Sequence, residues 1–185
     1  NMKTLNNFLE TTEYTWIESQ YIKMGKYINA IKYIMENKPK VIVEYGGGKS
    51  TLMITELVNY LDYGGKVIAY ESGESFYKKH IESGWNKYNN INLVEMEETI
   101  EYEIPGIRYI HPMEDIQGVD FVIIDGPDLH SFSSDPATTF NLMDIVNHLG
   151  YEVPYFIDGR KFTRNFYSSN LSYTTDIGDS KTLWR

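Results

Sequence analysis

The apolar residues of the chain recur with two different spacings, and these spacings predict alternating helices and strands. Between positions 17 and 37 they recur every three or four residues, as on one face of a helix, which Pro39 ends. Short runs that are apolar throughout follow, and such runs are typical of parallel strands buried on both faces. The predicted strands are 41–43, 66–70, 91–96, 121–124 and 154–157, and the predicted later helices are 50–61, 74–88, 135–150 and 161–169.

Two stretches depart from this alternation. The segment 97–117 is acidic and contains Pro105 and Pro112, so we expect a loop there, with a small hairpin near 107–110. The last residues alternate around a turn at Gly178, which predicts a terminal hairpin. Together these patterns predict an α/β fold with a mostly parallel sheet and crossover helices on both of its faces.

Composition and charge narrow the class of protein. At 185 residues, with 42% hydrophobic and 23% charged residues, the chain suits one folded domain, 1–185. The net charge of -9 disfavours nucleic acid as a partner, because the surface as a whole repels polyanions. Cysteine is absent, which excludes disulfides and fits a reducing compartment. No stretch is long and apolar enough to span a membrane, so we expect a cytoplasmic protein.

The stretch KVIVEYGGGKSTLMITELV (40–58) places three consecutive glycines between a strand and a helix. A triphosphate-binding loop needs Gly-x-x-x-x-Gly-Lys-Ser/Thr, but its first glycine would fall on Val43. The dinucleotide pattern Gly-x-Gly-x-x-Gly fits at Gly46 and Gly48, yet its third position is Thr51. A structural turn is the simplest interpretation, but three glycines are more than a turn requires, because each loses backbone entropy on folding.

The acid before these glycines gives the loop another interpretation. Glu44 ends the strand and is followed by Gly46 and Gly48, and in this order the chain resembles the class I S-adenosylmethionine-dependent methyltransferases. The first motif of that family is an acid followed by x-Gly-x-Gly-x-Gly/Ser. The resemblance implies a Rossmann-like three-layer sandwich with a mostly parallel seven-stranded sheet and a C-terminal antiparallel hairpin. It covers 41–185, with 1–40 as an N-terminal helical extension or lid.

Other parts of the family pattern follow in order. Glu71 ends the second strand, where a carboxylate can accept hydrogen bonds from both ribose hydroxyls, with Ser72 beside it. Asp125 ends the fourth strand, at the sheet edge where open α/β sheets bind ligands. S-Adenosylmethionine carries no phosphate, and its sulfonium and ammonium groups suit nearby acids. The resemblance implies that its binding residues are Glu44, Tyr45, Gly46, Gly47, Gly48, Ser50, Glu71, Ser72 and Asp125.

Catalysis of methyl transfer rests mainly on proximity and orientation. A general base is needed only for an acceptor that must lose a proton, such as a hydroxyl or an amine. The candidate catalytic residues at strand ends are His130, Asp128 and Asp158, with His130 first and Asp125 as a further candidate base. An exposed loop histidine is the alternative for His130. Asp125, Asp128 and Asp158 also suit a magnesium ion. No metal is predicted, because Asp158 is followed by Gly159 and not by the asparagine of metal-dependent catechol-type O-methyltransferases.

Other polar residues are weaker candidates for a functional role. His111 is a second candidate base, whereas His80 and His148 are expected on helix surfaces. Arg160 and Arg164 either clamp an anionic acceptor or pair with surface acids, and pairing is the commoner role.

These observations predict transfer of a methyl group from S-adenosylmethionine to an unidentified, small-molecule acceptor. The chain has no basic stripe, so neither nucleic acid nor a membrane is an expected partner. Two alternatives stay open. One is an NAD(P)-dependent oxidoreductase, which would need a third loop glycine. The other is a non-catalytic nucleotide-binding or cofactor-binding domain.

Overall fold

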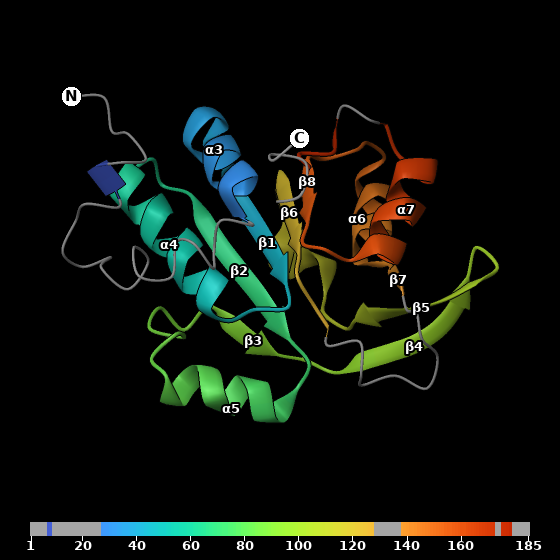
Figure 1. The fold of residues 1–185 in the computed structure, drawn as a ribbon, viewed down its shortest axis with the longest axis horizontal. Helices are drawn as coiled ribbons and strands as arrows, with labels where there is room; N and C mark the ends of the chain where they lie inside the picture. The colour runs from blue at the N-terminus through green and yellow to red at the C-terminus, as the bar shows by residue number, and fades with distance from the viewer. Residues whose placement is uncertain (1–6, 9–26, 128–137, 173–174, 179–185) are drawn as a thin grey trace.

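A parallel five-stranded sheet forms the centre of the computed structural model, which describes residues 7–8, 27–127, 138–172 and 175–178. After three strands the chain returns to the middle of the sheet, so that the fourth strand lies on the other side of the first (Figure 1). This reversal creates a switch point between the two strands, where open α/β sheets bind ligands. In spatial order the strands are β3 (Ile91–Leu93), β2 (Lys66–Glu71), β1 (Val41–Tyr45), β6 (Phe121–Ile124) and β8 (Tyr155–Ile157).

Helices cover both faces of this sheet. One core lies beneath α3 (Ile28–Asn37) and α4 (Lys49–Leu61), and the other lies beneath α6 (Asn141–Leu149) and α7 (Lys161–Asn170) (Figure 1). Successive strand residues point to opposite faces, so Ile42 joins the first core and Val43 the second. A further helix, α5 (Glu74–Glu82), follows β2 and contacts β2 and β3.

A second, three-stranded sheet lies below α6 and α7 in Figure 1. The strands β4 (Met96–Glu101) and β5 (Ile104–Tyr109) form an antiparallel hairpin, and β5 pairs in parallel with β7 (Thr138–Thr139). Tyr102 and Glu103 make its turn, both with positive φ (54° and 63°), as in the tight turns that match strand twist. The expected loop at 97–117 is therefore wrong over most of its length; a short helix, η3 (Met113–Ile116), occupies its end.

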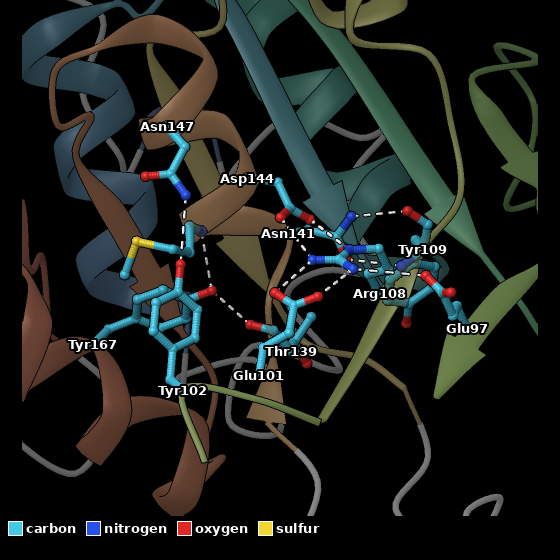
Figure 2. Close-up of polar contacts among 11 residues, drawn as sticks. Glu97, Glu101, Tyr102, Arg108, Tyr109, Thr139, Asn141, Asp144, Asn147 and Tyr167 are labelled. Atoms are coloured by element: carbon cyan, nitrogen blue, oxygen red, sulfur yellow. Dashed lines mark hydrogen bonds and ion pairs between the residues drawn. The ribbon is translucent and has the colours of Figure 1, made fainter. Parts of the chain in front are cut away.

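Arg108 on β5 fastens this hairpin to α6. Its guanidinium donates to Glu101 at 2.5 and 2.9 Å and to Asp144 at 3.0 and 2.9 Å (Figure 2). Hydrogen bonds from the guanidinium to Asp144 and then to Glu101 raise its pKa. The Asn141 side chain adds two hydrogen bonds to the backbone of Tyr109, at 2.8 and 2.9 Å (Figure 2). These contacts hold the hairpin against the start of α6.

The expected seven-stranded sheet with a C-terminal antiparallel hairpin is wrong. β4, β5 and β7 pair with one another and not with the main sheet. Where the hairpin was expected, Asp176 forms an isolated parallel bridge with Tyr155, and the Ile177 N–H donates to the Tyr155 carbonyl at 2.8 Å. The second arm expected at 181–184 lies outside the described residues.

Other element boundaries differ less. The strand at 121–124 is confirmed, and the helices expected at 50–61 and 161–169 are each one residue longer. The helix expected at 74–88 is shorter: α5 ends at Glu82, and Gly84 follows with a φ of +72°. α6 begins at Asn141, after β7, so the helix expected at 135–150 is wrong over 138–140. Positions 135–137 lie outside the described residues, as do positions 17–26 of the expected first helix. None of the described helices is long and apolar enough to cross a bilayer.

Candidate active site

A cleft of about 480 Å³ lies where β1, β2 and β6 end, at the switch point of the main sheet. Because the strands are parallel, residues that directly follow them meet at one edge of the sheet. The lining residues are Tyr27, Gly46, Gly47, Gly48, Lys49, Ser50, Glu71, Phe76, His80, Asp125, Gly126, Pro127 and Arg160.

At each of the three glycines, a side chain would point into the protein and meet other residues. Gly46 has a φ of +93°, and a Cβ atom there would lie 2.3 Å from the Gly126 nitrogen. A Cβ atom on Gly47 would lie 3.0 Å from the Ala69 Cβ atom, and one on Gly48 would lie 3.0 Å from the His80 ring. Glycine is thus required at Gly46, the space beside Gly47 and Gly48 is tight, and the backbone itself forms the cleft wall.

The backbone N–H groups of these glycines are all used inside the protein. Those of Gly46 and Gly47 donate to the Tyr70 carbonyl at 2.9 and 3.1 Å, and that of Gly48 donates to Thr51 Oγ1 at 2.9 Å. Phosphate-binding loops instead point such N–H groups at the ligand. The N–H groups of these three glycines are therefore not directed at a ligand.

Glu44 and Tyr45 lie beneath or behind the cleft and do not line it. The Glu44 carboxylate is fully buried, and the hydroxyls of Ser50 and Thr51 donate to its two oxygens at 2.5 Å each. It thus joins the end of β1 to the start of α4. The Tyr45 side chain enters the core on the other face of the sheet, where its hydroxyl bonds to His111.

Glu71 faces the cleft with one oxygen already engaged. The backbone N–H groups of Ser72 and Gly73 donate to Oε1 at 2.8 and 3.0 Å. Oε2 lies 3.4 Å from His80 Nε2. Ser72 does not line the cleft. Its contribution to the site is the backbone N–H group that orients the Glu71 carboxylate.

His80 lies in the wall of the cleft, and its expected place on a helix surface is wrong. Only 6% of the residue is exposed, and it is the one buried residue of α5. Gly48 provides the reason, because the His80 ring occupies the space that a side chain on that residue would take. The alternation of polar residues in α5 contains no sign of this long-range contact.

At the end of β6, Asp125 accepts a hydrogen bond from the Tyr27 hydroxyl. Tyr27 is fully buried, and its pKa is raised well above the usual value by burial, then by the carboxylates of Asp125, Glu44 and Asp158. Arg160 donates to the backbone carbonyls of Asp125, at 2.6 Å, and Pro127. This arginine therefore fixes the loop after β6.

The predicted catalytic residues are only partly placed. Asp128 and His130 lie outside the described residues. Asp158 follows β8 and is half-buried, with its N–H donating to the Ile124 carbonyl at 2.9 Å, but it does not line the cleft. Within the described ranges, no group of three His, Cys, Asp or Glu residues is placed to hold a metal ion.

The other candidates lie away from the cleft. His111 stacks on Tyr70 with ring centroids 4.1 Å apart and is not a lining residue. His148 is exposed, as expected for a helix surface. Arg164 pairs with Asp176, donating to both of its carboxylate oxygens at 2.9 Å.

Several lining residues were not predicted from the sequence. Gly126 and Pro127 directly follow the predicted Asp125, so the end of the strand was a usable signal for them. Phe76 lies two residues into α5 and is 43% exposed. Tyr27 gave no signal of a role in the cleft, since it lies within the expected first helix, whose apolar residues indicate packing.

Comparison with known proteins does not assign the chain to a family. No protein-family model, curated protein or solved structure matched the chain. The order of the strands and the groups in the cleft therefore carry the functional argument.

Proposed function

We propose that this protein is an S-adenosylmethionine-dependent methyltransferase with a small-molecule acceptor, and that the cofactor binds in the cleft at the ends of β1, β2 and β6. The observation that carries the proposal is the glycine loop, which gives the cleft a bare wall while keeping its three N–H groups for internal bonds. Such a wall suits a ligand that approaches closely and has no phosphate.

The β2 side of the cleft suits a nucleoside. The Glu71 carboxylate is an acceptor for hydroxyl donors such as those of a ribose. Phe76 offers a partly exposed aromatic ring on the same side, against which an adenine ring can stack. We therefore assign the adenosine half of the cofactor to Glu71 and Phe76.

The β6 side suits the cationic half. Asp125 lines the cleft there and is the acid nearest the turn into Gly126 and Pro127. Its charge favours a sulfonium or an ammonium group. When bound, S-adenosylmethionine would supply an activated methyl group. Asp125 would orient the acceptor and accept its proton, while Tyr27 and Arg160 hold the carboxylate and its loop in place.

Of the two alternatives, the oxidoreductase fits this geometry less well, and the non-catalytic domain differs only in activity. An NAD(P)-dependent oxidoreductase needs N–H groups directed at a diphosphate, and those of Gly46, Gly47 and Gly48 are internally bonded. A non-catalytic cofactor-binding domain would share the cofactor site but show no turnover. As part of the same proposal, we place the protein in the cytoplasm, which suits a cysteine-free chain.

Methyl transfer is tested by following release of S-adenosylhomocysteine with a panel of small hydroxyl, amine and carboxylate acceptors. With an accepted substrate, Asp125→Asn should lower turnover at least about tenfold, because a general base typically contributes about 10²–10⁴ in rate. Asp62→Asn, at an exposed position after α4, is the matched control and should leave the rate unchanged. Cofactor binding without turnover on any acceptor would favour the non-catalytic domain.

A further inference from the structure

The Glu71 carboxylate has room for a ligand on one oxygen only. A carboxylate oxygen has two lone-pair directions, and Oε1 already accepts the N–H groups of Ser72 and Gly73. The second oxygen, Oε2, faces His80 Nε2 at 3.4 Å. The sequence suggested that the two oxygens accept both ribose hydroxyls. The hydroxyl bound to Oε1 would then displace hydrogen bonds from the Ser72 and Gly73 N–H groups. Recognition of a hydroxyl therefore falls to Oε2.

His80 is enclosed on the sides that would let it move away from Glu71. A Cβ atom on Gly48 would lie 3.0 to 3.5 Å from three atoms of the His80 ring. Trp85 packs against the ring with centroids 5.4 Å apart. Nδ1 is buried and has no hydrogen-bond partner within the described part of the chain. A histidine used only for packing would leave this polar nitrogen buried without compensation, whereas an apolar ring would fill the same space.

We propose that His80 is a positioning residue for sugar recognition: through Nε2 it holds Glu71 Oε2 toward the cleft, where this oxygen accepts a hydroxyl of the cofactor ribose. The inference rests on the proposed function. With Nε2 protonated, the imidazole donates toward Oε2 and prevents the carboxylate from turning its free oxygen away. The two backbone N–H groups fix the other oxygen, so the carboxylate is held from both sides.

The test compares the dissociation constants of S-adenosylhomocysteine and of its analogue lacking both ribose hydroxyls. The wild-type protein should bind the complete ligand at least about tenfold more tightly, because the analogue cannot donate a hydroxyl hydrogen bond to the Glu71 carboxylate. His80→Phe keeps the ring against Gly48 and Trp85 but removes both nitrogens. It should reduce this ratio to about threefold or less, and His80→Gln, whose amide can donate, should restore part of it.

His148→Phe, an exposed position on α6, is the matched control and should keep the wild-type ratio. Should His80→Phe fail to fold, His80→Asn removes the contact with a side chain too short to reach Glu71. A wild-type ratio in the folded His80 variants, even with weaker overall affinity, would overturn the role of His80 and leave the proposed function intact. No binding of S-adenosylhomocysteine by the wild-type protein would overturn both.

Discussion

Gly46 and Gly126 pack backbone against backbone just beyond the carboxyl ends of the neighbouring strands β1 and β6. A Cβ atom on Gly46 would lie 2.3 Å from the Gly126 nitrogen, and one on Gly126 would lie 2.4 Å from the Gly46 Cα atom. The contact joins the loop after β1 to the loop after β6, and both line the cleft. The β1 and β6 sides of the proposed site can therefore approach this closely because both residues lack a side chain.

Gly46→Ala should destabilise the protein by at least about 2 kcal/mol, because it adds a side chain at positive φ and against rigid backbone. Urea denaturation measures this. Gly64→Ala is the matched control, since Gly64 has a φ of +74° but open space around it, and should cost about 1 kcal/mol from backbone strain alone. Equal losses in the two variants would show that the contact with Gly126 is unimportant.

Gly48→Ala should weaken binding of S-adenosylhomocysteine with little loss of stability. The backbone of Gly48 is extended (φ 163°), so alanine is tolerated there, but its Cβ atom would press on the His80 ring at 3.0 Å. The effect would reach the ligand through His80 and Glu71. Calorimetry and denaturation of Gly48→Ala separate the two quantities. An unchanged dissociation constant would remove this link.

His111 should make the protein less stable as the pH falls below about 6.5, the ordinary pKa of histidine. Burial lowers the pKa of His111 in the folded state, and its neutral ring fits both partners, accepting from the Tyr45 hydroxyl at 2.8 Å and donating to the Pro112 carbonyl at 3.0 Å. Below the unfolded-state pKa the unfolded chain binds more protons, so acid favours unfolding.

The corresponding measurement is the free energy of unfolding between pH 5 and pH 8 for the wild type and His111→Phe, which retains a ring to stack on Tyr70. The stability advantage of the wild type should shrink on the acid side. His148→Phe provides the control for the loss of one histidine. Parallel pH curves for wild type and His111→Phe would contradict the assignment.

Arg108→Lys should destabilise the protein by about 1–3 kcal/mol, because a lysine cannot bond to Glu101 and Asp144 in the paired geometry that the guanidinium adopts. Urea denaturation gives the value, and Lys78→Ala, which removes the exposed pair with Glu82, should change stability far less. A loss at Arg108 no larger than that of Lys78→Ala would mean that the hairpin does not depend on this contact.

The residues of the candidate site that could be predicted from the sequence are those that directly follow strands. Gly46, Glu71 and Asp125 were found this way, because apolar runs mark the strands and parallel strands bring their ends together. Glu44 shows the limit of the method. Its position at a strand end suggested a ligand contact, yet its side chain points under the loop to Ser50 and Thr51.

The remaining features depend on contacts between distant parts of the chain. His80 is an ordinary polar residue of a short helix until Gly48, 32 positions earlier, leaves room for its ring. Arg108 reaches Asp144 across 36 positions, and the acidic β4 becomes a strand because it pairs with β5. Local periodicity carries no information about such pairing, so β4 and β5 fell largely within an expected loop and β7 within an expected helix.

Isothermal titration of the wild-type protein with S-adenosylhomocysteine, with NAD and ATP as parallel ligands, tests the central proposal most directly. A glycine loop without free N–H groups should bind the first ligand with a micromolar dissociation constant and neither of the others, and Glu71→Gln should weaken that binding about tenfold or more. Binding of NAD or ATP in place of S-adenosylhomocysteine would contradict the proposed use of the cleft.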